Sequence, residues 1–284
     1  MRLGYNTNGL AHHDLLDAVA LLAEIGYRSV AITIDHGALA PGDPATPAQL
    51  RRLRALLERH GMASVIETGA RFLLDPRHKH EPTLVSPRAE DRACRLAFYR
   101  HALACAAELH SQCVALWSGR LKDPVDEAAA MSRLAAGLET LLADAQRFGI
   151  PIGFEPEPGM FIDSMAAFER LLARLDAPLL GLTLDVGHLH CQGEAPPEKY
   201  IRRFAARLVN VHIEDMRRGV HEHLMFGQGE IDFPPVIQSL AEIGYAGGVH
   251  VELSRHSHEG PEAARRAYDF LAPMFDKLAG RAPK

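Results

Sequence analysis

The sequence predicts an α/β protein with the TIM-barrel architecture, a single (β/α)₈ barrel that forms one domain over residues 1–284. The first observation is that eight short apolar runs, rich in Val, Ile and Leu, alternate with eight longer amphipathic segments. This order is typical of parallel strands, because a parallel pair needs a crossover connection. The second observation is the length, since such barrels commonly take about 250 residues. The third is that no linker, low-complexity tract or charge run divides the chain.

The order of elements follows from these patterns. Strands are expected over residues 2–6, 29–34, 63–68, 113–118, 151–156, 181–186, 208–213 and 248–253. Helices are expected over about 12–25, 47–60, 88–109, 126–148, 164–174, 197–206, 233–243 and 261–278. In the first helix, Leu15, Val19, Leu22 and Ile25 form one stripe at helical spacing, and Gly26 is a typical C-cap. An open doubly wound sheet is the alternative, but GYNTNGLAHH after the first strand lacks its glycine-rich phosphate-binding pattern.

Composition limits the partners of this protein. A formal net charge of -5 disfavours a surface built to bind nucleic acid. No apolar run approaches the roughly 18 residues of a membrane helix, and the N-terminal residues lack a signal-peptide pattern. We therefore expect a cytoplasmic protein without nucleic-acid or membrane partners, and a homo-oligomer stays open. The four cysteines match no Cys-x-x-Cys pattern, and Cys94 and Cys105 are expected to be reduced thiols in the core.

Side chains that can bind a metal end the last four predicted strands. Glu155 lies in GFEPEPG, Asp185 in GLTLDV, His212 in NVHIED and Glu252 in HVELS. Because the carboxyl ends of barrel strands meet at one mouth, these side chains should converge. Unpaired buried carboxylates are costly, and a shared dication removes that cost. Three carboxylates and one imidazole favour Mn²⁺, Mg²⁺ or Co²⁺ over a structural thiolate zinc site.

Other strand ends supply candidates for shaping the pocket. Trp117, the only tryptophan, ends the fourth strand, where it could stack on a sugar ring or serve as a rim or core hydrophobe. Glu157 could replace Glu155 as a ligand if the register of this strand differs. Three further residues end the first three strands and could contact hydroxyls or satisfy loop backbone, namely Asn6, His36 and Glu67.

The longest irregular segment, residues 71–87, follows the third strand and is predicted to be an active-site loop. It concentrates basic side chains, at Arg71, Arg77, His78, Lys79 and His80. One hypothesis is that this loop, and Arg71 above all, binds an anionic group of the substrate such as a phosphate or carboxylate. The alternative is a solvated loop that is balanced by Asp75 and Glu81.

Together these motifs resemble the xylose-isomerase-like TIM-barrel superfamily. The motifs are EP after the fifth strand, LDVGHLH after the sixth, VHIED after the seventh, HLMFGQGEID, and VEL after the eighth. The superfamily includes sugar epimerases of the D-tagatose 3-epimerase type, hydroxypyruvate isomerase, inosose dehydratase and the endonuclease IV branch. The resemblance follows the whole barrel in order, and its distinctive motifs lie in the second half. It is specific for the metal site and weak for the substrate.

The resemblance implies roles for individual residues. The four ligand-type residues above would hold one divalent metal, with Mn²⁺ as the first expectation and Mg²⁺, Co²⁺ or Zn²⁺ as alternatives. His188 would lie beside the metal and contact a substrate oxygen. Arg218, six positions after the metal histidine, would help to hold the substrate, and His223 would lie at the mouth as the start of the HxxxGxGxID motif. His190 is expected to point away from the His188 side if the strand continues.

The predicted function is a divalent-metal-dependent isomerase or epimerase that acts on a sugar, a keto-polyol or its phosphate through a metal-bound enediolate. Glu155 and Glu252 would form the acid/base pair, one removing and the other returning a proton. Loss of a β-hydroxyl from the same enediolate would instead make the protein a dehydratase. A more distant alternative is an endonuclease IV-like phosphodiesterase that recruits extra ligands, and a barrel that only binds a ligand is a third class. The candidates for those extra ligands are Glu67, His110, His188 and His223.

Overall fold

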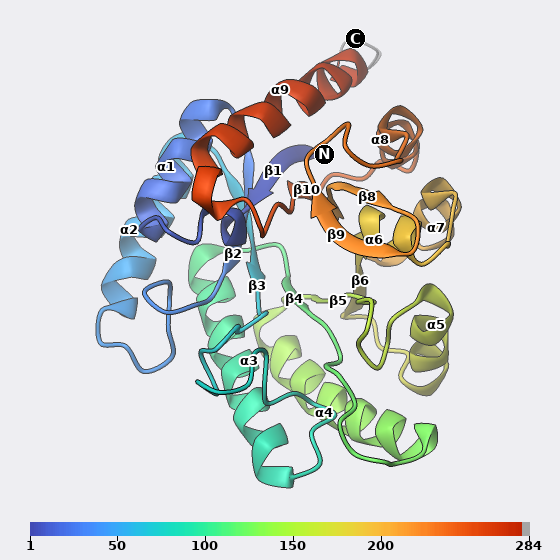
Figure 1. Ribbon diagram of the computed structural model, residues 1–284. Helices are drawn as coiled ribbons and strands as arrows, with labels where there is room; N and C mark the ends of the chain where they lie inside the picture. Colours follow the sequence, from blue (N-terminus) through green and yellow to red (C-terminus); the bar gives the residue numbers. More distant parts are fainter. Residues whose placement is uncertain (280–284) are drawn as a thin grey trace.

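The computed structural model describes residues 1–279 and confirms the predicted barrel (Figure 1). Parallel strands close into one barrel in the order β1-β10-β7-β6-β5-β4-β3-β2, and helices surround it. The barrel strands are β1 (Arg2–Asn6), β2 (Ser29–Thr33), β3 (Ala63–Glu67), β4 (Val114–Leu116), β5 (Ile152–Phe154), β6 (Leu180–Asp185), β7 (Leu208–Ile213) and β10 (Gly248–Val251). The predicted domain range also includes residues 280–284, which lie outside the described residues.

The predicted helices are all present, with small shifts at their ends. They are α1 (Leu15–Ile25), α2 (Thr46–His60), α3 (Ala89–Leu109), α4 (Glu127–Phe148), α5 (Met165–Arg174), α7 (Pro197–Arg203), α8 (Phe233–Glu242) and α9 (Gly260–Ala279). The first helix begins three residues later than predicted, because the Asp14 side chain accepts the Leu16 N–H and caps the helix there. Gly26 ends this helix with a positive φ of 126°, as expected of a glycine cap.

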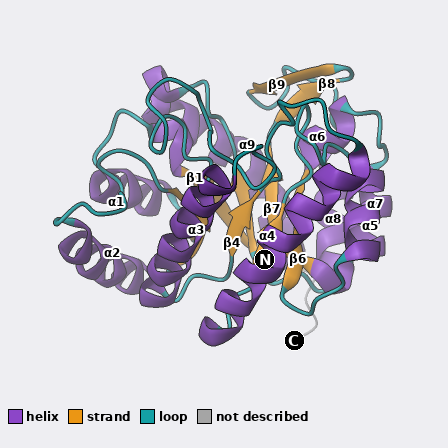
Figure 2. Cartoon of the chain, turned by 90° about the horizontal axis from the view of Figure 1, so that it is seen from below, coloured by secondary structure: helices purple, strands orange, loops and turns teal. Residues whose placement is uncertain are grey.

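Two elements at the mouth of the barrel differ from the prediction. The sixth strand ends at Asp185, and a short helix, α6 (Val186–Cys191), follows at once. A hairpin of β8 (Asp215–Arg217) and β9 (Val220–Leu224) follows β7, and its strands pair antiparallel with each other outside the barrel sheet. Figure 2 shows this hairpin at one end of the barrel, with the N-terminus toward the other end. The hairpin therefore covers the end where the functional side chains gather.

Two predictions from the sequence concern membrane helices and the burial of two cysteines. No helix within residues 1–279 is long and apolar enough to cross a membrane. Cys105 is buried as predicted, but the prediction for Cys94 is wrong, because this thiol is exposed on the solvent side of α3. The helical stretch around it is rich in small apolar residues, which say little about the face on which one cysteine falls.

Candidate functional site

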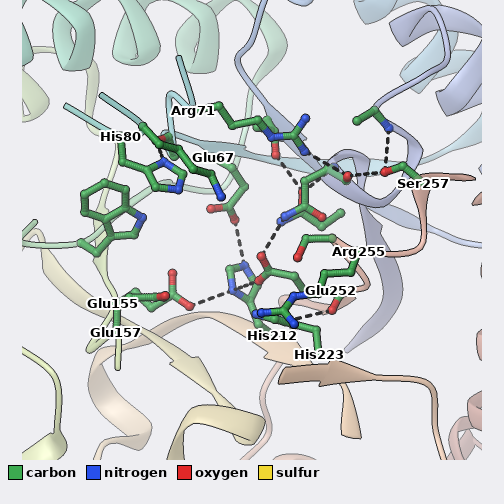
Figure 3. A pocket seen from close by; sticks show the side chains of 18 of the residues that line it. Glu67, Arg71, His80, Glu155, Glu157, His212, His223, Glu252, Arg255 and Ser257 are labelled. Atoms are coloured by element: carbon green, nitrogen blue, oxygen red, sulfur yellow. Dashed lines mark hydrogen bonds and ion pairs between the residues drawn. The ribbon is translucent and has the colours of Figure 1, made fainter. Parts of the chain in front are cut away.

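The four ligand-type residues from the last strands meet at the mouth of the barrel. Glu155 directly follows β5, Asp185 ends β6, His212 lies in β7, and Glu252 directly follows β10. The register pairs Asp185 with His212, which places both side chains at one level. One ligand atom from each of the four residues lies within 4.8 Å of the others. Figure 3 shows His212 between the carboxylates of Glu155 and Glu252.

His212 is oriented by hydrogen bonds on both sides of its ring. Its Nε2–H donates to Glu67 Oε1 at 2.9 Å, because a carboxylate can only accept. Asn210 Nδ2 donates to the same Glu67 oxygen at 3.2 Å. The opposite nitrogen, Nδ1, lies 3.1 Å from Glu155 Oε1 and 3.0 Å from Glu252 Oε2. When a metal displaces the proton from Nδ1, Glu67 keeps the other ring proton on Nε2, as carboxylates commonly do for metal-binding histidines.

The two carboxylate oxygens of Asp185 have different roles, one in capping a helix and one in the site. Oδ1 accepts the His188 N–H at 2.7 Å and caps α6, which is why the strand ends here. Oδ2 is buried without a hydrogen-bond partner and lies 3.9 Å from His212 Nδ1. A Cβ at Gly187 would lie 1.9 Å from a Glu214 carboxylate oxygen, so a larger residue in this turn would have to displace that buried side chain. The LDVGH sequence thus aims one bare carboxylate oxygen into the site.

The charges of this group fit a divalent cation. Burial, first of all, raises the pKa of Glu155 to about 8. Burial also opposes a charge on His212, yet the carboxylates of Glu155, Glu67 and Glu252 raise its pKa well above the usual value. Burial disfavours an ionised Glu252 too, but the adjacent His212 holds its pKa far below normal. Without a metal, protons on Glu155 and His212 therefore offset the charge of this group, and a shared dication would replace those protons.

Glu252 is held from the side opposite His212. Asn8 Nδ2 donates to Glu252 Oε1 at 2.8 Å. The Asn8 carbonyl in turn accepts from Arg71 Nη2 at 3.0 Å and from Ser257 Oγ at 2.9 Å (Figure 3). Asn8 and Ser257 were not predicted, because hydrogen bonds between loops that are about 250 positions apart leave no local pattern in the sequence.

A group of histidines lies beside the carboxylates. His188 in α6 and His221 and His223 in β9 each offer a ring nitrogen within 4.8 Å of the other two. His221 was not predicted. The alternation in GVHEHL could have indicated it, because residues two apart in a strand share a face. Burial lowers the pKa of His188 to about 4, and burial also lowers that of His221. The imidazoles of His188 and His221 are therefore neutral near pH 7.

The site opens into a cavity of about 540 Å³, a size that suits a small organic ligand. The cavity is lined by carboxylates and histidines at its base, and three cationic side chains lie along it, those of Arg71, Lys79 and Arg255. Trp117 also lines the cavity but is only 8% exposed, and the Arg95 guanidinium lies 4.9 Å from its ring centroid. This indole is thus mostly a packed wall with one edge on the cavity.

Some predicted residues lie away from the cavity. Arg218 is exposed in the turn of the hairpin, where its backbone N–H donates to Glu230, so a substrate contact by this residue stays a prediction. Arg77 is exposed and His78 pairs with Asp75 at 2.9 Å, which fits the solvated alternative for that part of the loop. The strand ends at Asp185 and α6 follows, so the condition under which His190 would point away from the His188 side is not met.

The positions of Glu157 and His110 test two alternatives from the sequence. One is that Glu157 replaces Glu155 as a metal ligand, and the other is that His110 supplies an extra ligand for a nuclease. Glu157 groups with Glu155 and His188, whereas only Glu155 belongs to the four-residue group, so the geometry favours Glu155 as the ligand. His110 caps the C-terminus of α3, just before β4 begins, and so lies at the other end of the barrel. It is therefore too far from the mouth to supply a ligand for nuclease chemistry.

Glu67 gives a first prediction. Glu67→Ala should weaken divalent-metal affinity by about 10–100-fold, because His212 loses the acceptor that fixes its tautomer. Glu67→Gln should weaken it less, since the amide oxygen still accepts from Nε2–H. Isothermal titration calorimetry with Mn²⁺ on the metal-free wild type and the two variants checks this order of affinities. Equal affinities for the three proteins would contradict this role of Glu67.

With this geometry in place, the comparisons with known proteins define the class. The family model described as "Xylose isomerase-like TIM barrel" matches residues 19–274, and the chain belongs to that family. An inosose dehydratase of Geobacillus kaustophilus is 27% identical over 281 residues, which cover 87% of this chain and 82% of that protein.

Two solved structures share the fold. A D-tagatose 3-epimerase-like protein has a TM-score of 0.78 at 20% identity, with all of both chains covered. The IolI protein, described "with a binding zinc atom", has a TM-score of 0.78 at 17% identity, covering 98% of this chain and 99% of its own. At these identities the two structures establish the barrel and leave the reaction open.

Proposed function

We propose that this protein is a divalent-metal-dependent isomerase or epimerase acting on a sugar, a keto-polyol or its phosphate. The observation that carries the proposal is the pair of carboxylates, Glu155 and Glu252, on the two sides of His212 Nδ1 at the base of the cavity. Their strands, β5 and β10, are separated in the barrel by β6 and β7. A substrate between them can meet a different carboxylate on each face.

Four residues would hold the metal, namely Glu155, Asp185, His212 and Glu252. When bound, a divalent metal polarises a substrate carbonyl and so acidifies the neighbouring C–H. Mn²⁺ is the proposed ion because three of the four ligands are carboxylates, and Mg²⁺, Co²⁺ and Zn²⁺ remain alternatives. The unpartnered Asp185 Oδ2 and the raised pKa values of Glu155 and His212 support a cation here.

The side chains of this protein then move the proton. One carboxylate removes the proton next to the carbonyl to give an enediolate, and the other returns it. Return to the same carbon from the opposite face inverts that carbon, and return to the neighbouring carbon exchanges an aldose and a ketose. Asn8 keeps one Glu252 oxygen in place during the transfer. We assign three other predicted site residues to substrate contacts on the walls of the cavity, namely His223, Trp117 and Arg71. A substrate contact by His188, which is buried beside the carboxylates, stays a prediction.

A dehydratase is the second candidate, and relatives named inosose dehydratase favour it. The same proton removal would be followed by loss of a β-hydroxyl as water. A phosphodiesterase receives no such support, because His110 lies at the other end of the barrel and the formal charge is -5. A cytoplasmic location and a homo-oligomer remain predictions.

Product analysis tests the proposal. Protein loaded with Mn²⁺ is incubated with ketoses, keto-inositols and their phosphates, and the products are identified by NMR. A new diastereomer or aldose supports the isomerase or epimerase, whereas a product that has lost water would replace it with the dehydratase. If the protein binds metal but converts none of these compounds, the result counts against both the isomerase or epimerase and the dehydratase.

Metal binding should depend on pH. The pKa of His212 is raised above its ordinary value and that of Glu155 to about 8, so both hold protons at neutral pH without metal. A metal must displace these protons, and the competition weakens as the pH rises. The dissociation constant for Mn²⁺ should fall by up to about tenfold per pH unit per displaced proton between about pH 6 and pH 8. Calorimetry in two buffers of different ionisation enthalpy counts the protons released, and a pH-independent affinity would contradict the ligand set.

The basic loop gives a further prediction with a matched control. Arg71 lines the cavity and its guanidinium lies 3.2 Å from Asp35, whereas Arg77 faces solvent. Arg71→Ala should raise the KM for a phosphorylated substrate by about tenfold relative to the unphosphorylated one, because a charge-assisted contact is lost. Arg77→Ala should leave this ratio unchanged. Steady-state kinetics of both variants on the two substrates check it, and equal effects would favour a solvated loop.

A further inference from the structure

A series of hydrogen bonds runs through the interior of the barrel, below the metal site proposed above. It links Ser29 in β2, His250 in β10, Asn210 in β7 and Glu67 in β3, and we call it the interior network. All four side chains are buried, and the first three are 0% exposed. The interior of such a barrel is ordinarily packed with branched apolar side chains. Packing alone therefore does not account for these polar residues.

The direction of each hydrogen bond in the network follows from Glu67. A carboxylate only accepts, so the Asn210 atom that lies 3.2 Å from Glu67 Oε1 is the amide nitrogen. The amide oxygen then lies 2.8 Å from His250 Nδ1 and accepts its N–H. The His250 ring is completely buried and has no carboxylate partner within residues 1–279, so it is neutral and Nε2 keeps a lone pair. Ser29 Oγ–H donates to this Nε2 at 2.8 Å, and every donor points toward Glu67.

The network ends at the metal-binding histidine. Glu67 Oε1 accepts from Asn210 and also from His212 Nε2–H at 2.9 Å. Asn210 and His212 are two positions apart in β7, so both side chains lie on the same face of that strand. His250 is the register partner of His212 in the neighbouring strand. Two donors on one oxygen hold the Glu67 carboxylate in place, and the carboxylate in turn orients the His212 ring.

Two glycines make room for the His250 ring. A Cβ at Gly4 in β1 would lie 2.4 Å from His250 Cδ2, and a Cβ at Gly248 in β10 would lie 2.2 Å from His250 Cε1. Both separations are far shorter than an ordinary contact between two carbon atoms. The ring therefore occupies a slot between strands that a side chain at either position would close. This slot holds the ring where Nδ1 meets Asn210.

We infer that His250 is a positioning residue for the proposed metal site and acts through Asn210 and Glu67 on His212. This role rests on the proposed function, because it concerns the affinity of that site for its ion. Within residues 1–279, His250 is not part of the cavity wall, so it does not act by touching the substrate. Without its N–H donor, the Asn210 amide is no longer fixed in direction. Glu67 and the His212 ring are then less well oriented, and the ion binds more weakly.

The affinity for Mn²⁺ tests this inference through two variants of one residue. Calorimetric titration of the metal-free proteins should give a dissociation constant about 3–10-fold higher for His250→Leu than for the wild type. The effect should be smaller than that of Glu67→Ala, because the change lies further from the ion. His250→Asn should restore most of the affinity, since its amide N–H can take the place of Nδ1–H and donate to Asn210. The Tm of each protein is measured alongside.

Ser64→Ala is the matched control for the loss of a buried polar contact. Ser64 Oγ lies 2.8 Å from Ser111 Oγ, and this buried pair has no bond to the interior network within the described residues. Its loss should lower the Tm and leave the affinity for Mn²⁺ unchanged, whereas His250→Leu should change both. If His250→Leu does not fold, His250→Gln takes its place. Its longer side chain carries the amide to the position of Nε2 and leaves Asn210 without its donor.

The outcomes separate the role of His250 from the proposed function. Wild-type affinity in His250→Leu would overturn the positioning role, and so would an equal loss of affinity in Ser64→Ala. A His250→Asn protein that binds as weakly as His250→Leu would also overturn it, because the loss would then be one of packing. A wild type that binds Mn²⁺ but converts no sugar would contradict the proposed function and leave the role of His250 intact.

Discussion

Replacing Glu252 with glutamine is expected to lower the rate of proton exchange next to the substrate carbonyl by about 10²–10⁴-fold. The amide cannot accept the proton, although it can still take the hydrogen bond from Asn8 that now holds Glu252 Oε1. The rate of deuterium incorporation measured by NMR gives the effect directly.

The control for this variant is Glu222→Gln. Glu222 is a partly exposed carboxylate on β9 that pairs with Arg255 at 3.5 Å and is absent from the proposed ligand set. The Glu222→Gln protein should exchange the proton next to the substrate carbonyl at the wild-type rate. Metal content is measured alongside, because Glu252 is also a proposed ligand. A Glu252→Gln protein that retains its metal and exchanges at the wild-type rate would remove Glu252 from the acid/base pair.

Removal of the metal is expected to abolish turnover and to destabilise the fold. Chelation leaves the buried Glu155 and Asp185 and the mostly covered Glu252 close together, with only protons and His212 to offset their charge. An ion at 100 times its dissociation constant stabilises the folded state by about 2.7 kcal/mol. For a chain of this size, that corresponds to a Tm higher by about 5–10 °C.

Calorimetric scans of the metal-free and Mn²⁺-loaded protein measure this difference, and re-addition of Mn²⁺ should restore both Tm and turnover. Asp185→Asn should show a smaller Tm increase with Mn²⁺, because its Oδ2 is the bare oxygen aimed into the site. Full turnover after exhaustive chelation would contradict a metal-dependent reaction.

The barrel could be predicted because its signals are local. Each strand is a short apolar run, each helix shows a repeating stripe, and the alternation of the two dictates parallel pairing. The four-residue group could be predicted for the same reason. Glu155, Asp185, His212 and Glu252 are all fixed by where a strand ends, and barrel closure brings strand ends together without further information.

The remaining parts of the site depend on contacts between distant segments. Asn8 reaches Glu252 across 244 positions, and Glu67 reaches His212 across 145, so neither contact leaves a periodic pattern. Glu67 was predicted as a strand-end residue, but its role as the acceptor for His212 was not. The hairpin that carries His221 was missed because its strands are short and polar.

Solvent deuterium exchange is the most direct test of proton removal by Glu155 and Glu252. Mn²⁺-loaded protein and a responsive substrate are incubated in D₂O, and the carbon next to the carbonyl is followed by NMR. We expect that deuterium enters at this carbon, that chelation stops the exchange, and that Glu155→Gln and Glu252→Gln each slow it. Product formation without deuterium at that carbon, as in a direct hydride transfer, would contradict proton removal by this carboxylate pair.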